Sequence, residues 1–201
     1  MEIADMDLDL KGYIEIKRSN YNESEFLFEV FNQTAYLLFA ISNIHEVAVH
    51  MDLKPQNIMM INGIPKIADF GFSKIKRWIK EGENFHYGTF QFMSPELAKF
   101  DHDIKYVATK PDIWALGVII FQMLFGFDQY PYSVMDGMLQ QIVYLTRHNP
   151  KKVDYTNVFG KLEQYLETNK YLVEKLLRII ERCLNANPNA ADLYEQLIQS
   201  Y

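Results

Sequence analysis

The segment from His50 to Asn57 concentrates side chains that can bind phosphate or a metal ion. It supplies a carboxylate at Asp52, an amine at Lys54 and an amide at Asn57, and a second carboxylate, Asp69, follows a short apolar stretch. Phosphoryl transfer needs in-line positioning and cations that absorb charge on the phosphate oxygens, and little covalent help from the protein. An acid, a cation, an amide and a second acid around one point are suited to magnesium-assisted phosphoryl transfer.

These residues also resemble a known family, the eukaryotic protein kinases, and specifically their large C-terminal lobe. The sequence His-Met-Asp-Leu-Lys-Pro-Gln-Asn and the later Asp-Phe-Gly match two signature motifs of that family. Four further motifs recur in the family's order, so that the resemblance covers essentially the whole chain: Gly88-Thr89, Ser94-Pro95-Glu96, Asp112-x-Trp114-x-x-Gly117 and Asn187-Pro188. The resemblance implies an ATP-dependent serine/threonine kinase that transfers the γ-phosphate of ATP to Ser or Thr hydroxyls of a protein or peptide substrate.

The resemblance assigns catalytic and metal-binding roles to five side chains. Asp52 would accept or orient the proton of the substrate hydroxyl, and Lys54 would reach the transferring phosphate, as in Ser/Thr-directed members. Thr89 would bridge Asp52 and Lys54 through its hydroxyl. Asn57 and Asp69 would hold Mg²⁺ through oxygen atoms, which this hard cation prefers, and would thereby position ATP.

Three other motif residues are expected to support the site without touching substrate. His50 would pack beneath Phe70 and is not a zinc ligand, because no second His or Cys lies at ligand spacing. Asp112 would hold the catalytic loop through backbone hydrogen bonds, and an N-capping role for it at the start of its helix is compatible with that.

The N-terminal residues resemble the hinge that binds adenine through backbone groups. Glu2 and Ala4 would supply the carbonyl and the amide, and Met59 would form the apolar floor beneath the base. Either Asp7 or Asp9 would reach the ribose. A plain edge strand at the N-terminus is the alternative interpretation.

The domain expected from the resemblance is residues 1–201, a hinge plus C-terminal lobe only. With Met1 at the gatekeeper position, the glycine-rich loop, the strand lysine and the helix glutamate of the small lobe are not in this sequence. The N-terminal lobe is thus largely missing, and this chain alone is expected to have little or no activity. A pseudokinase-like scaffold or docking module is the main alternative, and a small-molecule kinase is a third.

Two positions depart from the family pattern. Met51 stands where most regulated kinases carry an arginine that pairs with a phosphorylated loop, and methionine makes no such charge-assisted bond. This non-RD loop should therefore depend less on phosphorylation. Glu96 normally pairs with an arginine at the position of Ala191, and Arg178 and Arg182 are the candidate substitutes.

The pattern of apolar residues predicts a mainly α fold with a small β-hairpin region. The resemblance implies a kinase-like C-terminal lobe, the α+β kinase fold in truncated form. Asn22 and Glu25 resemble a capping box at the start of a helix over Ser24 to about Ile44. Asn62-Gly63 predicts a tight turn between strands at 58–61 and 64–67. Further helices are expected at Met93–Ala98, Asp112–Gly126, Val134–His148, Leu162–Glu167, Tyr171–Asn185 and Ala191–Ser200.

Composition limits the remaining possibilities. The 201 residues are 49% apolar, enough for one domain with a sizeable core, and the net charge of −6 argues against a nucleic-acid partner. The basic cluster from Lys74 to Lys80 is local and indicates a solvated loop or a peptide-docking face. The apolar run Ile113–Phe127 is shorter than the roughly 20 residues of a membrane span, so we expect a buried helix and no membrane partner. Cys183, the single cysteine, fits a reducing intracellular compartment, cytoplasmic or nuclear. The oligomeric state is left open.

Overall fold

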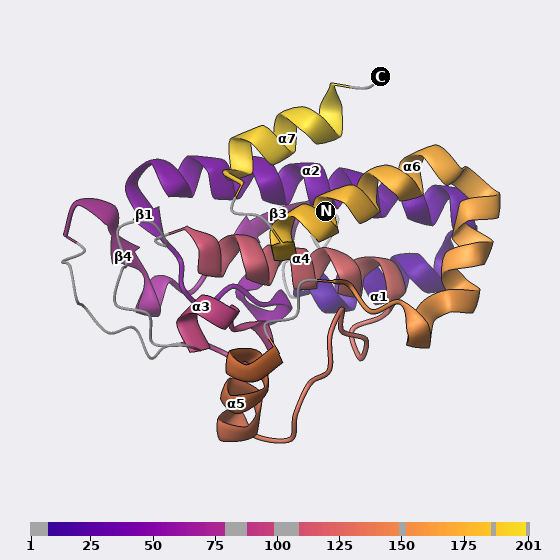
Figure 1. The fold of residues 1–201 in the computed structure, drawn as a ribbon. Helices are drawn as coiled ribbons and strands as arrows, with labels where there is room; N and C mark the ends of the chain where they lie inside the picture. The colour runs from indigo at the N-terminus through magenta and orange to yellow at the C-terminus, as the bar shows by residue number, and fades with distance from the viewer. Residues whose placement is uncertain (1–7, 79–87, 99–108, 149–151, 186–187, 200–201) are drawn as a thin grey trace.

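The structure, a computed structural model, describes residues 8–78, 88–98, 109–148, 152–185 and 188–199. These residues are mainly helical, as predicted, and they form two small antiparallel sheets, of which one is the predicted hairpin and the other was not predicted (Figure 1). The α-helices are α1 (Leu10–Asn20), α2 (Glu23–Val47), α3 (Pro95–Ala98), α4 (Lys110–Phe125), α5 (Met138–His148), α6 (Phe159–Asn185) and α7 (Ala190–Ile198). The 3-10 turns are η1 (Pro55–Asn57), η2 (Phe70–Phe72), η3 (Lys76–Trp78), η4 (Phe90–Phe92) and η6 (Thr156–Val158).

Helix α4 forms the centre of the core. It packs against α6 and α2, and every residue from Pro111 to Phe125 is buried, which confirms the predicted buried helix (Figure 1). The helix begins before Asp112, with Thr109 at the N-cap position, so the suggested capping role of Asp112 is wrong. It ends at Gly126, whose φ of 129° is a conformation that side chains with a Cβ rarely adopt.

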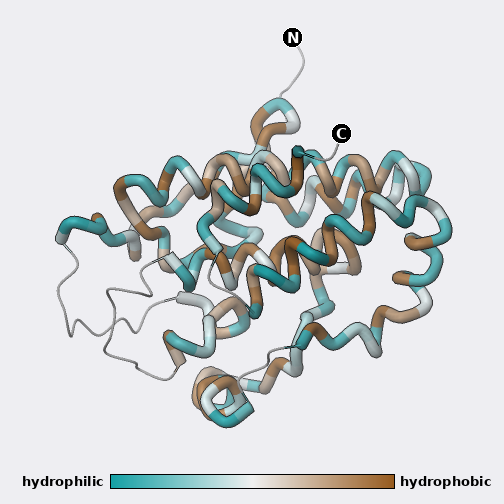
Figure 2. The backbone as a smooth tube through the Cα atoms, turned by 45° about the horizontal axis from the view of Figure 1, so that its top comes forward, coloured by the Kyte–Doolittle hydropathy of each residue, from teal (hydrophilic) through white to brown (hydrophobic). Residues whose placement is uncertain are grey.

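Helix α2 starts at the predicted capping box. Asn22 Oδ1 accepts from the Glu25 amide at 3.0 Å and the Glu25 carboxylate accepts from the Asn22 amide at 3.1 Å, which satisfies two end donors of the helix. The helix continues to Val47, and α7 and α6 pack along it. Apolar and polar residues alternate around its turns and around those of α6 (Figure 2). Most apolar side chains of the two helices are buried where the helices pack around α4, although Phe28 and Phe39 of α2 stay exposed.

Helices α1 and α6 differ from the expectation. Helix α1 was not predicted; Asp9 is its N-cap, accepting from the Gly12 amide at 2.8 Å. Helix α6 joins the two predicted helices, but Asn169 has non-helical angles (φ −155°, ψ 80°) between them. Asn169 Oδ1 accepts from the Leu172 amide at 3.1 Å, so its side chain caps the second half of α6.

The two sheets connect the loop 50–57, which is the expected catalytic loop, to the segment that follows it. Strand β2 (Ile58–Ile61) pairs with β3 (Ile64–Ile67), and β1 (Ala48–Val49) pairs with β4 (Lys74–Ile75). Asn62 and Gly63 have φ of 53° and 73°, which confirms the predicted turn. The hairpin therefore returns the chain directly to the end of the catalytic loop.

No helix among the described residues is long and apolar enough to cross a membrane.

Candidate active site

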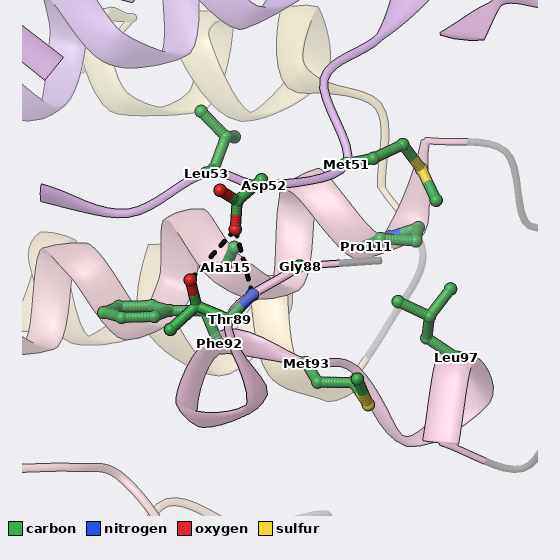
Figure 3. Close-up of a pocket in the computed structure, with 10 residues that line it drawn as sticks. All are labelled: Met51, Asp52, Leu53, Gly88, Thr89, Phe92, Met93, Leu97, Pro111 and Ala115. Carbon is green, nitrogen blue, oxygen red and sulfur yellow. Dashed lines mark hydrogen bonds between the residues drawn. The ribbon is translucent and has the colours of Figure 1, made fainter. Parts of the chain in front are cut away.

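The carboxylate of Asp52 is the centre of a closed hydrogen-bond network. Asp52 is 4% exposed, and its Oδ1 accepts from the Thr89 amide at 2.9 Å and from the Thr89 hydroxyl at 3.0 Å (Figure 3). Its Oδ2 accepts from Lys54 Nζ at 2.8 Å and from Asn57 Nδ2 at 3.2 Å. Lys54 Nζ also donates to Thr89 Oγ1 at 3.1 Å. The buried charge of Asp52 is thus balanced by one cation and three further donors, as a buried carboxylate requires.

Thr89 connects two segments that are far apart in the sequence. Its hydroxyl donates its single proton to Asp52 and accepts from Lys54, so the hydroxyl is committed in both directions. The predicted contact of Thr89 with both residues is therefore present. It fixes the segment beginning at Gly88 against the catalytic loop.

Asn57 lies at the base of the same loop. Its Nδ2 also donates to the main-chain oxygen of Asp52 at 2.9 Å, and its own main-chain oxygen accepts from the Ala68 amide at 2.8 Å. Because Nδ2 faces Asp52, Oδ1 faces away, and no described residue donates to it. One oxygen ligand of the kind magnesium prefers is therefore uncommitted.

Asp69 follows Ala68 and is brought to the same end of the hairpin. Its side chain is exposed, and its Oδ1 accepts from the Gly71 amide at 3.3 Å. Its backbone is left-handed, with φ of 58°, a conformation that aspartate tolerates better than most residues. No hydrogen bond joins Asp69 to Asp52 among the described residues; the two are linked through Ala68 and Asn57.

His50 fixes the distance between the loop and the Asp-Phe-Gly segment. Its Nδ1 lies 3.3 Å from the Asp52 amide, so it acts as the acceptor there, and its Nε2 then donates to the Ala68 oxygen at 2.9 Å. Its ring meets that of Phe70 edge-on, with centroids 5.0 Å apart. The predicted packing of His50 with Phe70 is confirmed.

Asp112, in the first turn of α4, supports the loop from the core. It is 1% exposed, and its carboxylate accepts from the amides of His50 at 2.7 Å and Met51 at 2.8 Å, as the resemblance implied. His45 Nε2 lies 3.0 Å from the same carboxylate. Helix α4 therefore fixes the backbone that carries Asp52.

Met51 packs its side chain among apolar neighbours and is not at the surface. It is 7% exposed, has φ of 71°, and lies by Leu97 and Pro111 around a very small cavity (Figure 3). A Cβ on Gly88 would come within 2.8 Å of the Met51 main-chain oxygen. Methionine cannot pair with a phosphorylated loop, as the sequence indicates. Its side chain is instead used for packing.

Glu96 does have a cationic partner, but neither of the two arginines suggested from the sequence. Lys110 Nζ binds Glu96 Oε1, and both side chains are about one-fifth exposed, at 19% and 23%. Glu96 Oε2 is buried without a hydrogen-bond donor among the described residues. The prediction of Arg178 or Arg182 was wrong, because the contact of Lys110 with α3 depends on the tertiary fold.

The structure describes only some of the residues that were predicted to contact the nucleotide. Glu2, Ala4 and Asp7 lie outside the described residues. Met59 is half-buried in β2 and forms a β-bridge with Asp9. Because Asp9 Oδ1 is already committed to capping α1, its assignment to the ribose gains no support from this structure.

Comparison with known proteins agrees with this geometry. The family model described as the protein kinase domain matches residues 1–200. The chain belongs to the protein kinase family.

Several kinases resemble it over most of its length. A protein named as a probable cell division protein kinase of Encephalitozoon cuniculi is 30% identical over 96% of this chain and 66% of its own length. CBL-interacting protein kinase 5 of Oryza sativa is 30% identical over 81% of this chain and 32% of its own. The dual specificity protein kinase zak2 of Dictyostelium discoideum is 27% identical over 92% of this chain and 25% of its own. The chain thus spans two thirds or less of these relatives.

Proposed function

We propose that this chain is the hinge and catalytic C-terminal lobe, residues 1–201, of an ATP- and Mg²⁺-dependent protein serine/threonine kinase. The acceptor would be a Ser or Thr hydroxyl of a protein substrate. The observation that carries the proposal is the network in which Asp52, Lys54 and Thr89 hold one another, with Asn57 at its edge. A site that had lost its catalytic function would not be expected to retain a buried carboxylate with all of these hydrogen-bond donors.

In this proposal each side chain acts on the substrate hydroxyl or the phosphate. Asp52 would orient the hydroxyl and accept its proton. Because each of its oxygens already accepts two hydrogen bonds, the lone pair for the substrate would be freed on Oδ2 as Lys54 turns away. Lys54 would turn its ammonium toward phosphate oxygens while Thr89 holds it in place. The buried Asp112 would keep the loop from moving as charge develops.

The residues present fit a magnesium ion. Asn57 Oδ1 receives no donor from the described residues, and the Asp69 carboxylate is exposed, so two oxygen ligands are available beside the loop. We assign Asn57 and Asp69 to the metal and, through it, to ATP, with Glu2, Ala4 and Met59 as contacts of the adenine. When bound, the ion would neutralise charge on the phosphate oxygens.

The test is phosphotransfer from Mg-ATP to a Ser/Thr peptide library by the longest natural form of the protein that contains this chain. Asp52→Asn keeps the shape of the side chain and should lower the rate by about 10² to 10⁴, with the circular dichroism spectrum unchanged. Unchanged turnover in that variant would contradict the proposal. A wild-type protein that binds peptides but transfers no phosphate would favour the scaffold alternative.

The 201 residues contain no glycine-rich phosphate loop, so we expect the isolated chain to show little or no turnover. We also expect the protein to act in the cytoplasm or nucleus, since its single cysteine, Cys183, is buried and makes no disulfide.

A further inference from the structure

A cleft opens beside the hydrogen-bond network around Asp52. Its volume is about 420 Å³, within the usual range of ligand pockets. Lys54 and Thr89 form one edge of it, and Lys11, from the first turn of α1, forms another. A chain segment bound there would lie directly next to the site where the acceptor hydroxyl must sit.

The charges around this cleft favour an acidic occupant. Among the described residues that line it there is no Asp or Glu, and Gln56, Gln91 and Gln122 are polar and uncharged. The charge of Lys54 is largely balanced by Asp52 at 2.8 Å. Within the described part of the chain, Lys11 pairs with Glu15 at 3.8 Å, and both side chains are about half exposed, so this pair is weak. Lys11 therefore leaves positive potential at the cleft.

Aromatic side chains also line the cleft. Phe92, Phe127 and Tyr130 are half-buried and provide apolar surface. Gln122 Oε1 has no hydrogen-bond donor among the described residues, but it is buried and an occupant of the cleft does not reach it. The rings suit the apolar parts of an extended peptide.

We propose that this cleft receives the substrate segment that flanks the phosphoacceptor, and that Lys11 makes the protein select an Asp or Glu side chain there. The proposal rests on the proposed kinase function, which it deepens by naming the class of substrate. Lys11 would act as a specificity-determining residue, because it lines the cleft without joining the Asp52 network.

The test measures peptide binding to the 201-residue chain without nucleotide, so it does not depend on turnover. Fluorescein-labelled peptides centred on Ser carry Glu, Ala or Lys at each of the three positions on either side, and affinity is read from fluorescence anisotropy at low and high salt. At one or more positions the Glu peptide should bind about three-fold or more tighter than the Lys peptide, and salt should reduce the difference.

The variant Lys11→Glu should reverse that preference. The matched control is Lys170→Glu on α6, which also removes a lysine paired with an acid four residues later at 3.8 Å but does not line the cleft. The control should keep the preference of the unmodified chain. An unchanged preference in Lys11→Glu, an equal change in both variants, or no measurable binding of any peptide would overturn the proposal.

The two proposals can fail separately. Loss of the charge preference in the binding test leaves the effect of Asp52→Asn on phosphotransfer untouched. Conversely, a charge-dependent cleft in a protein without phosphotransfer would leave Lys11 selecting a bound partner, and the proposed kinase reaction would be wrong.

Discussion

Substitution of Lys110 by methionine should destabilise the protein because it leaves Glu96 without its cation. Lys110 is the first residue of α4 and Glu96 lies in α3, so their ion pair joins the segment after Thr89 to the core helix. Methionine keeps most of the length of the side chain and removes only the charge. The effect then reports on the ion pair more than on packing.

The size of the effect follows from the burial of the pair. Exposed ion pairs contribute about 0.2 to 1 kcal/mol, whereas breaking a fully buried one costs about 3 to 5 kcal/mol. With the side chains of Lys110 and Glu96 19% and 23% exposed, and with one Glu96 oxygen buried without a donor, the pair falls between these cases. We expect a loss of about 2 kcal/mol, which for a domain of this size lowers Tm by about 4 to 8 °C.

The assay is urea and thermal unfolding followed by circular dichroism. The exposed pair Lys170 and Glu174 provides the control, because Lys170→Met should cost less than about 0.5 kcal/mol. In a double-mutant cycle, adding Glu96→Gln to Lys110→Met should recover about 1 kcal/mol or more. The reasoning is refuted if Lys110→Met costs no more than Lys170→Met, or if the cycle shows no coupling.

Three further predictions concern the site and the core. Thr89→Val should lower phosphotransfer by about ten-fold or more while Thr89→Ser keeps most of it, since only serine retains the hydroxyl that bridges Asp52 and Lys54; steady-state kinetics on the longest natural form of the protein would check this. Gly88→Ala should destabilise by more than about 1 kcal/mol in urea unfolding, because the glycine has φ of 109° and a Cβ would lie 2.8 Å from the Met51 oxygen. Burial raises the pKa of Cys183 to about 12, so the folded state favours the neutral thiol and stability is lost as pH rises from about 9 toward 12; unfolding measured at pH 8, 9 and 10 should show this decline, and Cys183→Ala should reduce its slope.

The parts of the fold that could be predicted are those set by neighbouring residues. The turn at Asn62-Gly63 depends on two residues that accept positive φ, and the start of α2 depends on Asn22 and Glu25 three positions apart. The loop residues Asp52, Lys54 and Asn57 are likewise close in sequence, so a short turn suffices to bring their side chains together.

What escaped prediction depends on contacts between distant segments or on weak local signals. Lys110 meets Glu96 across a separation that no periodicity describes. Lys11 belongs to α1, whose apolar residues Leu10, Tyr13 and Ile14 have helical spacing and follow the N-cap Asp9, a signal that could have revealed this helix. The cleft itself is assembled from α1, the catalytic loop, η4 and the end of α4, and it exists only in the folded chain.

The geometry of the loop is imposed by the core and is not a product of the charged groups alone. Met51 holds a left-handed backbone that costs a residue of its size on the order of 1 to 3 kcal/mol, and it lies directly before Asp52. The amides of His50 and Met51 donate hydrogen bonds to the buried Asp112, and the Met51 side chain packs among apolar neighbours. These interactions offset that cost. Because Asp112 belongs to the buried helix α4, the position of Asp52 depends on the packing of the core. Disturbing Asp112 should therefore displace the whole network around Asp52, even though Asp112 touches neither substrate nor metal in the proposed reaction.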